Sequence, residues 1–93
     1  MVSEEEAQRA TLEALGWIAS DEARIGAFLA ATGAAPETLR ESAREPGFMA
    51  SVWDYIMLSD ETVLEFCEAS GRAPESIAQI RAALPGGDTP HWT

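Results

Sequence analysis

The feature that most constrains this chain is a segment that occurs twice, 38 positions apart. FLAATGAAPETL at residues 28–39 recurs as FCEASGRAPESI at residues 66–77. Six of the ten residues from Phe28 to Glu37 are identical to their counterparts. A period of roughly 20–50 residues is typical of a repeated supersecondary unit. We therefore expect two related units, each containing the same corner between two helices.

Each copy of this segment has a glycine and, three residues later, a proline. Gly33 and Gly71 suit the left-handed conformation that ends a helix. Pro36 and Pro74 suit the first position of the following helix, because the backbone N–H that proline lacks has no partner there. These four residues are the predicted structural corners of the fold.

Helical periodicity predicts an all-α fold, a compact bundle of about six helices. Alanine is abundant and no stretch alternates apolar and polar residues, which disfavours strands. The expected helices span about 4–19, 21–32, 36–44, 47–58, 60–70 and 74–84. We expect two three-helix units, at about 4–45 and 46–85, to pack through their first helices around one core. Residues 1–85 would form a single domain, and residues 86–93 a short C-terminal tail.

Serines followed by acidic residues mark three predicted helix starts, at Ser3, Ser20 and Ser59. A serine side chain accepts a hydrogen bond from the first helical turn, and acidic residues there complement the helix dipole. The Ser-Asp-Glu sequences at 20–22 and 59–61 lie 39 positions apart, not 38. This difference predicts one residue gained or lost inside the preceding helix.

The segment 47–58, GFMASVWDYIML, is apolar almost all round. A helix of this kind is either buried or forms an interface. Large aromatic residues usually fill a core, but they also anchor interfaces, so Trp53 and Tyr55 are candidate interaction residues. Asp54 needs a partner if it is buried, and an arginine is the natural one. Arg40, Arg24 and Arg81 are the candidates for that partner, and Asp54 and Arg40 join the candidate interaction residues.

The charge of the chain excludes several function classes. The formal net charge is −10, lysine is absent, and all six basic residues are arginines. Such a surface repels nucleic acids and anionic membranes, and it offers no lysine for a Schiff base or a phosphate loop. The N-terminal sequence has no signal pattern and no apolar run is long enough to span a membrane. We therefore expect a soluble cytoplasmic protein that binds neither nucleic acid nor membrane.

Cys67 and His91 are single occurrences of their residue types. One cysteine cannot form an internal disulfide, and Cys67 lies on an apolar helix stripe, which favours a buried structural role. Zinc sites require three or four ligands at defined spacings, which one cysteine and one distant histidine do not supply. We expect no metal and no cofactor. Trp92, next to His91, is expected to attach the C-terminal tail to the body.

The residues described above resemble a bacterial family of short helical proteins, domain of unknown function 3572. The resemblance rests on Phe28-Leu29, the Gly33-to-Pro36 corner, Leu39-Arg40, the aromatic segment 48–58 and Asp60-Glu61. Gly86-Gly87 and Trp92 are also similar to the end of the family's sequences. The family has no assigned activity. The resemblance therefore implies an all-helical fold and no mechanism.

Three hypotheses for the function follow. The first is a non-catalytic module, a small regulator or adaptor that binds another protein or a second copy of itself. The second is a small enzyme or ligand-binding domain with a pocket near Asp54. The third is a helix-turn-helix nucleic-acid binder, which the acidic charge and the glutamates around Arg40 and Arg44 disfavour. The first is preferred, and no catalytic residue is assigned.

Overall fold

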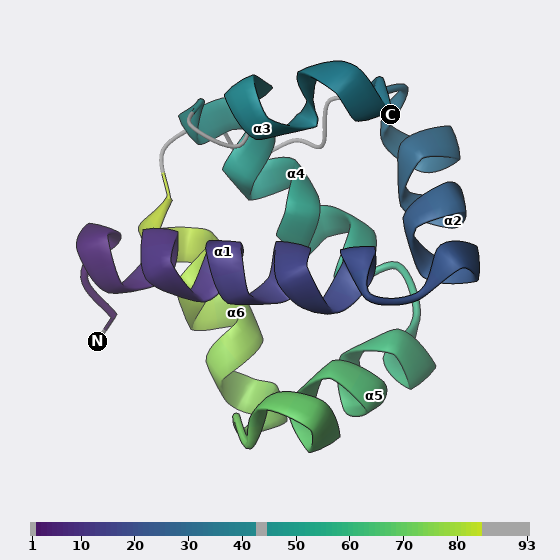
Figure 1. Cartoon of the computed structure of the whole chain (residues 1–93). Helices are drawn as coiled ribbons and strands as arrows, with labels where there is room; N and C mark the ends of the chain where they lie inside the picture. Colours follow the sequence, from purple (N-terminus) through teal and green to yellow (C-terminus); the bar gives the residue numbers. More distant parts are fainter. Residues whose placement is uncertain (1, 43–44, 85–93) are drawn as a thin grey trace.

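A computed structural model describes residues 2–42 and 45–84, and it gives an all-α protein (Figure 1). The helices are α1 (Glu4–Ala19), α2 (Glu22–Thr32), α3 (Leu39–Ser42), α4 (Pro46–Ile56), α5 (Asp60–Ser70) and α6 (Pro74–Ala83). A short 3-10 helix, η1 (Pro36–Thr38), precedes α3. No strand occurs in the described ranges, so the predicted fold class is confirmed.

The longest helix, α1, crosses the molecule (Figure 1). It packs against α2, α4 and α6, while α2 also contacts α4, and α6 also contacts α4 and α5. The core at these contacts includes the fully buried Trp53, Phe28, Phe66, Ile18 and Ile56. The expected packing of the first and fourth helices against each other is observed.

The predicted bundle of six helices in two three-helix units needs correction. The segment 36–42 is a 3-10 turn followed by only four α-helical residues, not a full third helix. Glu45 has an extended backbone because the residue before a proline avoids the helical conformation, and Pro46 then opens α4. Five helices therefore have ten residues or more.

Helices from the two halves of the chain pack against one another around one core. The first helix, α1, packs on α6 from the second unit, and α2 packs on α4. The short α3 offers little apolar surface beyond Leu39, which packs against the core. Longer helices from the opposite half of the chain therefore cover α1 and α2.

The predicted gain or loss of one residue is wrong. The cap of α2 is Asp21, whose side chain accepts a hydrogen bond from the backbone N–H of Arg24 at 3.0 Å. Ser20 instead ends α1, where its hydroxyl donates to the carbonyl of Trp17 at 2.7 Å. Ser59 caps α5, as predicted. The two caps, Asp21 and Ser59, therefore keep the 38-residue spacing of the corners.

The two glycine–proline corners have the same conformation. Gly33 and Gly71 cap α2 and α5 with φ of 75° and 78°, in the left-handed region. Each glycine N–H donates to a carbonyl four residues back, at 2.8 Å in both cases. Pro36 opens η1 and Pro74 opens α6, as the sequence predicted. The second corner brings Arg72 next to α1, where its side chain donates a hydrogen bond to Glu13.

Candidate functional site

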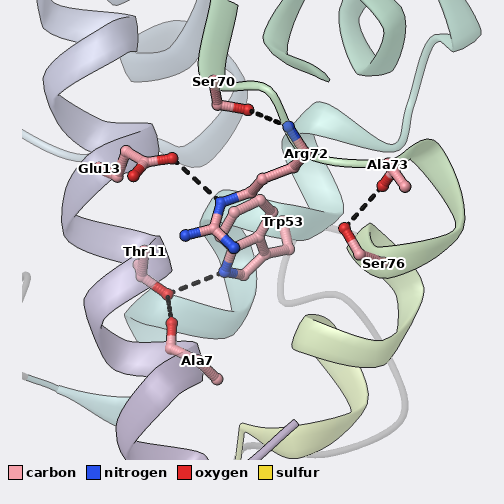
Figure 2. A network of polar contacts seen from close by, with 8 residues as sticks. All are labelled: Ala7, Thr11, Glu13, Trp53, Ser70, Arg72, Ala73 and Ser76. Atoms are coloured by element: carbon pink, nitrogen blue, oxygen red, sulfur yellow. Dashed lines mark hydrogen bonds and ion pairs between the residues drawn. The ribbon is translucent and has the colours of Figure 1, made fainter. Parts of the chain in front are cut away.

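Trp53, a predicted interaction residue, lies inside the protein. Its side chain is 0% exposed, and its indole N–H donates to the hydroxyl of Thr11 at 2.8 Å (Figure 2). The Thr11 hydroxyl donates in turn to the backbone carbonyl of Ala7 at 2.7 Å. A partner protein cannot reach Trp53 in this structure. The tryptophan belongs to the core, which is the usual place of large aromatic residues and the preferred interpretation of the sequence.

Asp54 pairs with Arg81, one of its three candidate partners. The guanidinium donates to both carboxylate oxygens, at 2.8 and 3.3 Å, and the two side chains are only 10% and 13% exposed. Arg24 lies elsewhere, beside Asp21 and Trp17. The side chain of Arg40 lies outside the described residues. The paired carboxylate therefore ties α4 to α6, as a buried charge requires.

The three adjacent candidates on α4 point in different directions, because successive helix residues are about 100° apart. Trp53 faces α1, Asp54 faces α6, and the half-buried Tyr55 sets its ring against Phe28 of α2 at 5.3 Å. The structure therefore does not bring these residues together into one site.

Cys67 has the predicted buried position, with an exposed fraction of 7%. Burial, and secondarily the nearby carboxylate of Glu75, raise the pKa of its thiol above the ordinary value. The thiol is therefore neutral near pH 7 and unsuited to nucleophilic chemistry. His91 and Trp92 lie outside the described residues.

In the described part of the chain, no three His, Cys, Asp or Glu side chains are grouped so that they could hold a metal ion. None of the described helices has both the length and the apolar character that crossing a membrane requires.

A surface groove lies beside Trp17, whose side chain is half-buried. The Trp17 ring packs against the ring of Phe66 at a centroid distance of 5.3 Å, and the guanidinium of Arg24 lies 4.1 Å from its centroid. One hollow of about 230 Å³ is lined by Glu13, Trp17, Phe66, Ala69 and Ser70. A second, more open hollow of about 400 Å³ is lined by Trp17, Arg24, Glu65, Glu68 and Ala69.

These two hollows share Trp17 and Ala69, and together they are called the Trp17 groove. Of two other hollows, one lies between the end of α2, the end of α3 and the start of α4, and the other lies beside α6; Asp54 lines neither of them, nor the Trp17 groove. The Trp17 groove is lined by two aromatic residues, Trp17 and Phe66. Aromatic side chains held at a partly exposed position are typical anchors of protein interfaces.

The charges around the Trp17 groove are unevenly paired. Arg72 donates to Glu13 at 3.0 Å (Figure 2), and Arg24 lies 3.9 Å from Asp21. Each of these arginines therefore has its own carboxylate. Glu65 and Glu68, by contrast, form no ion pair with any described side chain. The groove consequently has an excess of negative charge.

Sequence reasoning missed this groove, although one signal for it was present. Trp17 and Ile18 are adjacent on α1 and point about 100° apart, so they cannot both lie at the centre of its buried face. Ile18 is fully buried, and Trp17 is therefore at the edge of the apolar stripe. A large aromatic residue at such an edge indicates a partly exposed ring.

The fold and the groove define a small all-helical protein with an acidic surface and an aromatic surface groove. Residues 4–87 match the family described as protein of unknown function DUF3572, and the chain belongs to this family. The resemblance inferred from the corners and the aromatic helix is thereby confirmed. No curated protein matches the chain, and neither does any solved structure. The function of the family is unknown, and the groove is therefore the basis for proposing one.

Proposed function

We propose that this protein is a non-catalytic module, a small regulator or adaptor, that binds a segment of another protein in the Trp17 groove. The observation that carries the proposal is the setting of Trp17, half-buried between Phe66 and Arg24 and flanked by two hollows. A ring held in this way has lost most of its rotational freedom before binding. A partner that covers it gains apolar contact at a small entropic cost.

The residues suited to chemistry support a binding role over a catalytic one. The carboxylate of Asp54 forms an ion pair with Arg81 within the fold, and the thiol of Cys67 is buried and neutral. The acidic charge favours a positively charged protein surface as the occupant, because a nucleic acid or anionic membrane would be repelled.

The test uses two matched variants that add the same neutral bulk at different places. Ala69→Gln places a glutamine in the Trp17 groove, and Ala27→Gln places one on the exposed surface of α2. Wild-type and variant proteins serve as baits in a lysate of the source cell, and the captured proteins are quantified by mass spectrometry. Thermal unfolding first establishes that both variants fold.

We expect at least one protein to be captured by the wild type and by Ala27→Gln, and to be lost from Ala69→Gln. Its affinity, measured with the purified proteins, should fall about tenfold or more in Ala69→Gln, which corresponds to about 1.4 kcal/mol. Capture that is equal for all three baits overturns the proposal. So does a wild-type bait that captures nothing above the bare matrix.

A further inference from the structure

We infer that the Trp17 groove takes two neighbouring side chains of a partner segment, an apolar one beside Phe66 and a lysine or arginine beside Glu65 and Glu68. The inference rests on the proposed function and names the chemistry of the partner. It follows from the different surroundings of the two hollows that meet at Trp17 and Ala69.

The hollow beside Phe66 suits an apolar side chain, because its polar groups are already paired. Glu13 accepts from the side chain of Arg72 at 3.0 Å, and the hydroxyl of Ser70 accepts from the backbone N–H of Arg72 at 3.3 Å (Figure 2). What remains available is the partly exposed ring of Trp17 and the exposed side chain of Ala69, next to the buried ring of Phe66. The volume of this hollow, about 230 Å³, is below the roughly 300–1,000 Å³ of small-molecule pockets, which favours a single side chain of the partner as its occupant.

The second hollow suits a cation. Arg24 is engaged by Asp21, the hydroxyl of Ser20 and the carbonyl of Trp17, so its charge is balanced locally. Glu65 and Glu68 are three residues apart on α5, which places them on one face of the helix. Their carboxylates have no ion pair among the described side chains, and both line this hollow. A lysine or arginine of the partner would supply the missing positive charge.

Arg24 also limits where the partner cation can lie. Its guanidinium already occupies a face of the Trp17 ring, at 4.1 Å from the centroid. A second cation is therefore expected at the carboxylates of Glu65 and Glu68, and not over the ring. This arrangement makes electrostatic attraction to α5, together with apolar contact at Trp17 and Ala69, the basis of partner selection.

The experiment selects a phage-displayed library of random 12-residue peptides on the immobilised full-length protein. We expect the enriched peptides to carry an apolar residue next to, or one residue away from, a lysine or arginine. A synthetic peptide of the enriched sequence should bind Glu65→Gln/Glu68→Gln about tenfold more weakly than the wild type at low salt. Glu6→Gln/Glu41→Gln, which removes two exposed carboxylates elsewhere, is the matched control and should retain the wild-type affinity.

The outcomes separate this inference from the proposed function. Peptides that are lost from Ala69→Gln but bind Glu65→Gln/Glu68→Gln as well as the control overturn the inference and leave the proposed function standing. Enriched peptides without basic residues also overturn the inference and leave the proposed function standing. Peptides that bind Ala69→Gln as well as the wild type contradict both, because the Trp17 groove is then not the binding site. A library that yields no enriched peptide overturns the inference, and the bait experiment then decides the proposed function alone.

Discussion

The indole nitrogen of Trp53 and the hydroxyl oxygen of Thr11 lie 2.8 Å apart, and both side chains are fully buried. The two residues are 42 positions apart, so the bond joins α4 to α1 across the core. The Thr11 hydroxyl accepts from Trp53 and donates to the carbonyl of Ala7, which satisfies both groups. A threonine on the buried face of α1, among alanines, is explained by this bond.

Replacing Thr11 with valine should destabilise the protein by about 1–3 kcal/mol, because the shape is kept while the indole N–H of Trp53 loses its acceptor. Urea unfolding followed by tryptophan fluorescence measures the difference. Trp53→Phe in the Thr11→Val background completes a double-mutant cycle. Valine should lower stability less once Trp53 is absent. Equal losses in both backgrounds would show that the hydrogen bond contributes nothing.

The ion pair between Asp54 and Arg81 predicts a second effect on stability. Asp54→Asn should lower the free energy of unfolding by about 1–3 kcal/mol, because the guanidinium of Arg81 then loses its countercharge in a largely buried place. Glu5→Gln is the matched control, since the Glu5–Arg9 pair is exposed. That change should alter stability by less than about 0.5 kcal/mol. Equal effects of the two variants in chemical denaturation would refute a structural role for Asp54.

Glycine-to-alanine changes at two positions of α2 should have opposite signs. Gly33→Ala should destabilise by about 1–2 kcal/mol, because φ of 75° strains a residue with a Cβ. Gly26→Ala should stabilise by about 0.5–1 kcal/mol, because Gly26 is inside the helix and an added Cβ meets nothing within 4 Å. Thermal unfolding of both variants measures the signs. A stabilising Gly33→Ala would contradict the left-handed cap.

Local features of the fold were predictable because short-range chemistry determines them. Gly33, Gly71, Pro36 and Pro74 each have the predicted role, since left-handed caps and first-turn prolines depend on backbone geometry within a few residues. The choice of Ser20 over Asp21 as a cap failed for a similar local reason. Both residues can cap a helix, and the length of α1 decides between them.

Features that depend on the packing of distant segments were not predictable from one sequence. Trp17 and Trp53 are both large aromatic residues in apolar helices, yet the structure buries Trp53 and leaves Trp17 half-exposed at the groove. Three arginines were possible partners for Asp54, and the crossing of α4 with α6 selects Arg81. The candidate site depends on the fold, because residues of both α1 and α5 line the same hollow.

The buried thiol of Cys67 should react slowly with Ellman's reagent. Burial protects it, and its raised pKa leaves little thiolate in neutral buffer. We expect the rate in native protein at pH 8 to be at least about 100-fold lower than in urea-unfolded protein, a factor set by local opening of the fold. Absorbance at the reagent's product wavelength follows both reactions. Comparable rates would show that Cys67 is accessible in the folded state.

The same thiol should make stability depend on pH in the alkaline range. Its pKa is raised in the folded protein from an ordinary value of 9.0, so above that pH the unfolded state releases the proton more readily than the folded state. The contribution of Cys67 to stability is therefore intact below pH 9.0 and is lost as the pH rises through the higher folded pKa. Because high pH acts on the whole protein, the informative quantity is the difference from Cys67→Ala. Unfolding free energies measured from pH 7 to pH 11 should fall more steeply for the wild type than for this variant, and parallel profiles would contradict the assignment of the pKa shift to burial.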